Sequence, residues 1–450
     1  MFIKDKKFYT HIFTLMLPLI LQQLLRISVD TVNSIMLGSI DQVQMSAVAQ
    51  ANQIFFIYYT ICSGLSVGAC VLVSQYWGKG DRKSISVITA HALRVITAVG
   101  LAVTLAVALF PAFFMRIYSS DPDIVRIGAG YLRLVSFMYI PCGISVMLFG
   151  IGRGVEQVKI ILHTNILSYS VNILIDWLLI YGMFGLPKLG VTGVAIGTIA
   201  ARFVELLVCG YIFFSNPDIP FRPEDIRKSD PELRTAFFRI SLPIIAHEII
   251  WSLGTSSGAM ITGQLGKMAV AGYNVTTVLY DLFASIGHGL MHACSVVIGM
   301  TLGTGDTERA KKEANSMLVL GVITGVIVGL LTFVIKDVFL RLYALEPDSV
   351  RYARQFMNVI ACIWPFSLIE MITIVAILRA GGQGKVGFYA DIVIMWMICI
   401  PLAWFAAFRL HAEPWVVVAI IKSIIVLESI VGVIAVYRYK WLKNLTTGAK

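Results

Sequence analysis

The chain has 450 residues, of which 58% are hydrophobic and only 14% are charged, and its mean hydropathy is +0.81. This balance excludes an ordinary soluble domain and indicates a protein that crosses a membrane many times. The net charge of +10 does not indicate nucleic-acid binding, because the Lys and Arg residues lie between apolar runs rather than on one basic face.

Twelve apolar runs are long enough to cross a bilayer, which takes about 20 helical residues. We therefore predict an all-α, polytopic membrane protein. The predicted spans are residues 12–37, 49–74, 93–115, 127–150, 161–185, 190–214, 237–262, 272–300, 315–338, 352–378, 386–408 and 414–437.

Basic residues orient these spans. Segments on the same side as the N-terminus carry 21 Lys and Arg residues, against 8 on the other side. Because Lys-rich and Arg-rich loops stay on the inner side of the membrane, we expect both termini in the cytoplasm. Residues 215–236 are rich in prolines and charges and are predicted to link an N-lobe, 1–214, to a C-lobe, 237–450.

The first span carries polar side chains on one helix face. They recur at i, i+4, i+8 and i+11 as Gln22, Arg26, Asp30 and Asn33. A charge at the centre of a bilayer costs roughly 2.5–3.5 kcal/mol, so we expect Asp30 to face protein or water. It is either a functional carboxylate or one half of a structural pair with Arg26.

A second polar face runs along the fifth span, at Asn165, Ser168, Asn172 and Asp176. Thr198, near the outer end of the sixth span, lies at a similar depth. Asp30, Asn172, Asp176 and Thr198 could therefore meet in one cavity. Such oxygen ligands suit a sodium ion, and paired carboxylates suit a shared proton. The alternative is a hydrogen-bonded network that only holds helices together. Arg202 and Glu205, three residues apart, are expected to neutralise each other.

The two halves of the chain repeat each other at an offset of 225 residues. The matched pairs include Pro18 with Pro243, Gly38 with Gly263, Gly64 with Gly289, Gly78 with Gly303, and Asp81 with Asp306. An even number of spans returns each half to its starting side, so the repeats are parallel. We expect two six-helix lobes around a central cleft that opens alternately to each side.

The second half has polar groups of its own. Glu248 lies near the middle of the seventh span, and Glu370 lies deep in the tenth. In the eighth span one face carries Thr277, Asp281, Ser285, His288 and His292. Asp391 and Lys422 lie nearer to the ends of their spans, where a charged group can reach the membrane surface.

Several stretches together resemble the multidrug and toxic compound extrusion (MATE) family. They are Val29-Asp30-Thr31, Met36-Leu37-Gly38, residues 51–56 and 75–81, Asn172 with Asp176, residues 190–198, and Pro243 followed by Glu248 and Trp251. The resemblance implies export of bulky, often cationic compounds, driven by a proton or sodium gradient. In bacteria it implies the inner membrane.

The resemblance also implies two cation sites. Asp30, Asn172, Asp176 and Thr198 are similar to the family's N-lobe site. In the C-lobe, Glu248 matches a family position and Glu370 lies near the family's tenth-span carboxylate. Asp281 is added from the polar face of its own span.

We accordingly expect a secondary active exporter rather than an enzyme, monomeric and without a cofactor. The expected substrates are small, cationic or amphipathic organic compounds that reach the cleft among membrane lipids. Residues expected to line the cleft are Gln23, Arg26, Trp251 and His288. The alternatives are a lipid-linked oligosaccharide flippase of the same superfamily and an exporter of a metabolite other than a drug. A flippase would favour a basic cavity, whereas the acids within these spans favour cations.

Overall fold

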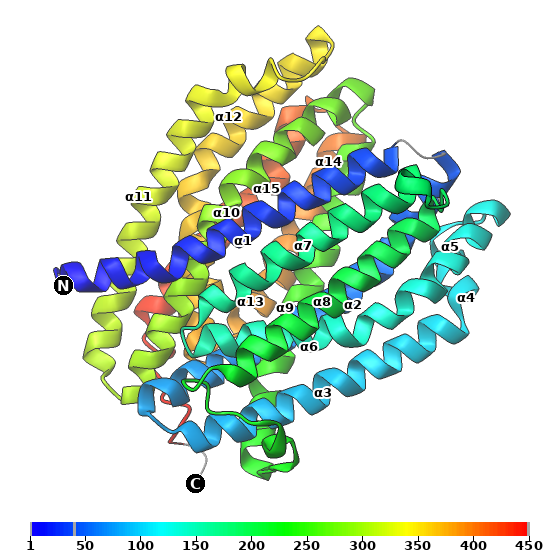
Figure 1. Cartoon of the computed structure of the whole chain (residues 1–450). Coiled ribbons are helices and arrows are strands. Elements are labelled where there is room, and N and C mark those ends of the chain that lie inside the picture. The colour runs from blue at the N-terminus through cyan, green and yellow to red at the C-terminus, as the bar shows by residue number, and fades with distance from the viewer. Residues whose placement is uncertain (1, 39–41, 448–450) are drawn as a thin grey trace. The chain divides into compact units, whose positions relative to one another are not determined.

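The computed structural model describes residues 2–38 and 42–447, which form helices and no strand (Figure 1). The first half contains α1 (Lys6–Gly38), α2 (Gln42–Lys79), α3 (Arg82–Leu109), α4 (Pro111–Tyr118), α5 (Pro122–Val135), η1 (Ser136–Met138), α6 (Tyr139–Gly154), α7 (Val158–Tyr181), η2 (Met183–Gly185) and α8 (Val191–Ser215). The linker contains η3 (Pro223–Arg227). The second half contains α9 (Pro231–Gly263), α10 (Lys267–Thr304), α11 (Thr307–Leu340), α12 (Pro347–Glu370), the π-helical η4 (Met371–Leu378), α13 (Lys385–Ala390), the π-helical η5 (Asp391–Cys399), α14 (Ile400–Phe408) and α15 (Pro414–Tyr437).

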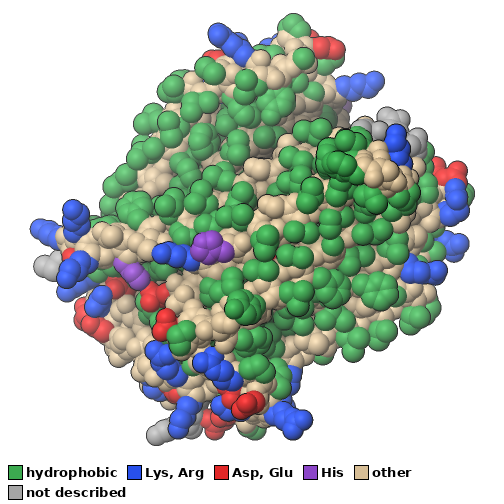
Figure 2. All heavy atoms as spheres, viewed as in Figure 1, with side chains coloured by type: hydrophobic (Ala, Val, Ile, Leu, Met, Phe, Trp, Pro, Cys, Tyr) green, Lys and Arg blue, Asp and Glu red, His purple; other side chains and the backbone are tan. Residues whose placement is uncertain are grey.

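The twelve predicted spans are confirmed, since twelve helical segments in the described residues are long and apolar enough to cross a membrane. Three of these segments join shorter elements, at Pro122–Gly154, Pro347–Leu378 and Lys385–Phe408. Hydrophobic side chains spread over the face shown in Figure 2, whereas charged side chains gather towards its margins. This distribution is typical of a protein whose middle is surrounded by lipid.

Contacts divide the chain into two compact units. The first-half unit comprises Leu21–Ile245, and the second-half unit comprises the residues up to Ile20 together with those from Ala246 onward. The division falls inside α1 and α9, two residues after Pro18 and Pro243 respectively. Each unit therefore includes half of a helix from the other half of the sequence. The lobe limits predicted at the linker stay a prediction.

The 225-residue offset also governs packing within the units. A Cβ added at Gly64 of α2 would lie 2.7 Å from Ile245 Cγ1 of α9. At its repeat partner, Gly289 of α10, a Cβ would lie 2.5 Å from Ile20 Cγ1 of α1. Both close approaches need a residue without a side chain. The same contact therefore occurs once in each unit, which supports the repeat predicted from glycine and proline positions.

The linker packs against α3. Ser86 Oγ donates to Asp225 Oδ2 at 2.7 Å, and Arg94 Nη2 donates to the Lys228 carbonyl, also at 2.7 Å. The hydrogen bond from Lys228, whose Nζ lies 2.7 Å from Asp225 Oδ1, lowers the pKa of that carboxyl to about 2. The linker is therefore fixed to the first-half unit by charge-assisted hydrogen bonds.

Candidate functional site

The polar face predicted on α7 is buried against α8. Asn165, Ser168, Asn172 and Asp176 are all buried, and Asp176 is only 1% exposed. Ser168 Oγ donates to the Ala201 carbonyl of α8 at 2.9 Å. The face therefore points into protein rather than lipid, because polar groups in a lipid-facing position would lack partners.

A chain of hydrogen bonds joins α1 to this face. Asn33 Nδ2 donates to Asn172 Oδ1 at 2.9 Å, and Asn172 Nδ2 donates to Asp176 Oδ2 at 3.1 Å. Asp176 Oδ1 is buried and accepts no hydrogen bond. An ionised oxygen without a donor is costly in such a place, so a proton or a small cation at Oδ1 would stabilise the site.

Gly197 of α8 lies directly against this oxygen. A Cβ at position 197 would be 1.9 Å from Asp176 Oδ1 and 3.0 Å from its Cγ. The next residue, Thr198, is half-buried and lies within hydrogen-bonding reach of Tyr131, a buried residue whose hydroxyl lies near Asp176. Of the four residues predicted to share a cavity, the structure places Asn172, Asp176 and Thr198 close together, and Asn33 and Tyr131 lie beside them although neither was assigned to the site.

We expect Gly197→Ala to displace the Asp176 carboxyl, because the added methyl would overlap Oδ1. Overpacking of this kind costs about 1–3 kcal/mol. The melting temperature of the purified protein in detergent should fall. Gly210→Ala is the control, because a Cβ there meets only Phe214 Cε2 at 3.9 Å. Its melting temperature should stay level or rise slightly, and an equal fall in both variants would contradict the prediction.

Asp30 lies on α1 one turn before Asn33, and its side chain is exposed in this structure. The positive charges that act on it come from Arg26 and Arg202. Arg26 Nε donates to Gln23 Oε1 at 3.1 Å, so these two expected cleft residues hold each other in place. Arg202 Nη1 lies 2.7 Å from Glu205 Oε2, which confirms the expected pair within α8.

In the second-half unit, a buried cation lies among several acids. Arg379 is 3% exposed, and its Nη1 lies 2.8 Å from Glu248 Oε1. Its Nη2 also donates to His247 Nδ1. Because a guanidinium only donates, Nδ1 must accept and the proton of a neutral imidazole is on Nε2. That nitrogen is 3.3 Å from Asp391 Oδ2, so His247 connects Arg379 to Asp391.

Asp391 and Glu428 are within hydrogen-bonding reach of each other. Two ionised carboxylates can only accept, so a hydrogen bond between them requires one proton to be shared. Glu370 is close enough for its charge to interact with Glu248, Arg379 and Asp391. Three acids, Glu248, Glu370 and Asp391, therefore lie close enough for their charges to interact with Arg379, and its single charge can neutralise only one of them.

Three residues of this site differ from the sequence analysis. Asp391 was expected near the membrane surface and is instead 0% exposed, at the junction of α13 and η5. Arg379 counted as a loop charge and is instead paired inside the unit. Lys422 also does not reach the surface, because its Nζ lies 4.5 Å from the centre of the Tyr280 ring. His247 carried no functional assignment at all.

A cavity of about 240 Å³ adjoins this cluster. It brings together three predicted residues, Trp251, Asp281 and Glu370, with others from α10, α12 and α15, notably Tyr280, Lys422 and Glu428. His288 does not line it, and its Nδ1 bonds to the Ala284 carbonyl at 2.8 Å. The cavity has aromatic walls and more acids than bases, which suits an organic cation.

Comparison with known proteins assigns the chain to a family. The model of the MatE family matches it twice, at residues 18–178 and 243–405. The two matches begin 225 residues apart, at Pro18 and Pro243, as the repeat requires.

The chain belongs to the MatE family.

Two bacterial proteins are among the relatives of this MatE protein. A probable multidrug resistance protein NorM of Agrobacterium fabrum is 26% identical over 411 residues, covering 88% of this chain and 86% of the relative. A probable multidrug resistance protein YoeA of Bacillus subtilis is 23% identical over 400 residues, covering 86% and 84%. A crystal structure of MATE in complex with MaL6 superposes with a TM-score of 0.86 at 16% identity, covering 96% of each chain. The MatE protein is thus an integral membrane protein with the fold of MATE transporters.

Proposed function

We propose that this MatE protein is a secondary active exporter that exchanges a cation from outside for an organic compound from inside. Its relatives are named multidrug resistance proteins, which supports drugs and similar compounds as substrates. The observation that carries the proposal is the set of three acids, Glu248, Glu370 and Asp391, whose charges meet the single charge of Arg379. Intramembrane acids that outnumber the nearby bases are stabilised by a proton or a cation, and the occupancy of such a site can be coupled to helix positions.

The proton is the coupling ion that the second-half cluster favours. Asp391 and Glu428 lie within hydrogen-bonding reach, and a proton shared between them would let one carboxyl donate to the other. Sodium remains the alternative at Asp176, where Oδ1 could accept either ion. Among the described residues, no group of three or more His, Cys, Asp or Glu side chains is arranged to hold a metal ion.

The proposed cycle uses the two units as rocking bodies joined through α1 and α9, with Pro18 and Pro243 beside the crossing points. We propose that both termini are cytoplasmic, on the basis of Lys and Arg distribution, and that the protein acts as a monomer in the bacterial inner membrane. Gln23, Arg26, Trp251 and His288 remain proposed substrate contacts.

Efflux of a fluorescent organic cation from proteoliposomes, with a proton or a sodium gradient imposed separately, tests the proposal. We expect the proton gradient alone to drive efflux. The variant that combines Asp30→Asn, Asp176→Asn and Glu248→Gln should lose gradient-driven efflux while still entering the membrane as a folded protein. Full activity in this variant would contradict a role for these acids.

One observation favours a substrate that also carries an anionic group. Lys422 lines the cavity of the second-half unit and lies near Asp281. A zwitterionic metabolite could place its anionic end on Lys422, so an exporter of a metabolite other than a drug is the second candidate. Competition by zwitterionic and purely cationic compounds in the same efflux assay separates the two. A flippase for lipid-linked oligosaccharides is less compatible with a 240 Å³ cavity in which acids outnumber bases.

A further inference from the structure

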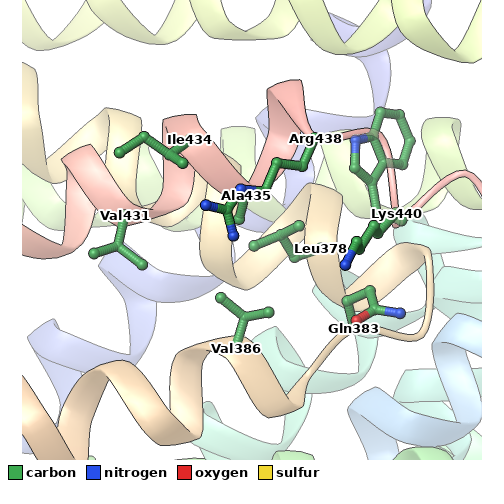
Figure 3. A pocket seen from close by; sticks show the side chains of 9 residues that line it. Leu378, Gln383, Val386, Val431, Ile434, Ala435, Arg438 and Lys440 are labelled. Atoms are coloured by element: carbon green, nitrogen blue, oxygen red, sulfur yellow. The ribbon is translucent and has the colours of Figure 1, made fainter.

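A second cavity lies at the end of α15, away from the acids described above. Its volume is about 360 Å³ (Figure 3). The lining residues are Leu378, Gln383, Val386, Val431, Ile434, Ala435, Arg438, Lys440 and Trp441. All of them belong to the second-half unit. The two charged residues are both basic, and no acid lines the cavity.

The cavity lies where membrane-spanning segments end. One candidate span ends at Leu378, another begins at Lys385, and a third ends at Tyr437. The aliphatic lining residues come from these spans, whereas Arg438 and Lys440 follow the end of the third. The cavity therefore has an apolar side within the membrane and a basic side at the boundary, where lipid headgroups lie.

The two cations are available to a ligand. Arg438 and Lys440 are exposed, and neither forms an ion pair with an acid in the described part of the chain. In Figure 3 the guanidinium of Arg438 extends back beside Ala435, and Lys440 extends towards Gln383. Both side chains thus reach into the same space from its basic side.

The segment that carries Lys440 is held in place. Trp441 is 0% exposed, and its Nε1 donates to the Val436 carbonyl at 2.9 Å. The chain turns back at Tyr439, whose φ is +56°, a left-handed conformation that costs energy for a residue with a side chain. Gly381 lies so close that a Cβ there would be 1.9 Å from the Trp441 carbonyl oxygen. The segment that carries Lys440 is therefore fixed by the buried Trp441 and by its close contact with Gly381.

An apolar strip leads from the cavity along α15. Ile434 is 49% exposed, and Ile430 and Leu427 are exposed on the same helix face. A small soluble anion has no apolar part that could pack against this strip. A molecule with a phosphate at one end and hydrocarbon chains at the other would fill both parts.

We infer that this cavity binds an anionic phospholipid. Arg438 and Lys440 hold the phosphate, and the Gln383 amide donates to an oxygen of the headgroup or the glycerol. The first acyl carbons lie against Val431 and Ile434 and continue along Ile430 and Leu427. The inference is independent of the proposed export activity, because it uses none of the acids in the cation sites.

Native mass spectrometry of the purified full-length protein tests the site with added phosphatidylglycerol, phosphatidylcholine and glycerol 3-phosphate. We expect one phosphatidylglycerol to bind more tightly than any phosphatidylcholine. The variant Arg438→Gln/Lys440→Gln should weaken this binding by roughly thirtyfold, as expected for two cations at an anionic headgroup. The control variant Arg341→Gln/Arg409→Gln removes two other exposed cations that follow membrane spans and should bind as the wild type does.

A cavity-filling variant separates shape from charge and does not depend on the first variant folding. Val431→Trp keeps both cations and should also lose the tight phosphatidylglycerol. Three results would overturn the inference. They are equal binding of phosphatidylcholine, wild-type affinity in the double Gln variant, and displacement of phosphatidylglycerol by glycerol 3-phosphate at equal concentration, which would identify a site for a soluble anion.

Discussion

Asp176→Asn is expected to uncouple export from the ion gradient. The substituted amide cannot take up a proton or pair with a cation at the position of Oδ1, although it can keep the hydrogen bond with Asn172. If the occupancy of this site contributes the 1–3 kcal/mol typical of coupling between sites, gradient-driven efflux should fall by roughly 5- to 150-fold. Efflux from proteoliposomes with an imposed gradient measures the change.

A matched control is Asp123→Asn, because Asp123 is an exposed acid near the start of α5 that pairs only with the exposed Arg126. Its efflux should equal that of the wild type. The melting temperatures of both variants should lie close to the wild-type value, since neither change alters volume. If Asp176→Asn exported at the wild-type rate, the Asn33–Asn172–Asp176 chain would be a structural network, the alternative recognised from the sequence.

Arg379→Met is expected to cause the largest loss of stability. Arg379 is the buried cation that faces Glu248, and its removal leaves several acids and His247 without that partner. Breaking a buried ion pair from one side costs about 3–5 kcal/mol. Thermal unfolding of the purified protein, followed by circular dichroism, should show a correspondingly lower melting temperature.

Two further variants show whether the loss comes from unpaired charge. Adding Glu248→Gln to Arg379→Met should recover part of the stability, because fewer acids then lack a base. Arg354→Met removes a comparable contact, since Arg354 Nε lies 2.6 Å from Asp337 Oδ1, but both side chains are about half exposed. That change should cost about 0–1 kcal/mol. Equal losses for Arg379→Met and Arg354→Met would contradict a special role for the buried pair.

The fold could be predicted closely from the sequence, and so could part of the first-half site. The number of spans could be predicted from the lengths of the apolar runs. The repeat could be predicted from glycine and proline positions, because close helix contacts such as those of Gly64 and Gly289 leave no space for a larger side chain. The polar face of α7 was predictable because Asn172 and Asp176 lie on one regular helix, where a spacing of four fixes their shared direction.

The second-half cluster could not be assembled from sequence spacing. His247, Asp391 and Glu428 come from three different spans and Arg379 directly follows a fourth, so their meeting depends on tertiary packing. Two π-helical segments also lie here: η4 ends immediately before Arg379, and η5 begins at Asp391. A π-helical turn shifts the direction of later side chains relative to the 3.6-residue period, so simple periodicity fails there. The expected position of Asp391 was wrong because proximity to a span end does not decide burial.

The crossing of α1 and α9 between units has a consequence for how the protein arose and how it assembles. Each unit is incomplete without a half-helix encoded in the opposite half of the gene. A chain with one such repeat could complete itself only by exchanging half-helices with a second copy, as domain-swapped dimers do. Duplication and fusion would turn that exchange into an internal one. During synthesis, the segment ending at Ile20 can pack against the rest of its unit only after the residues from Ala246 onward have been made.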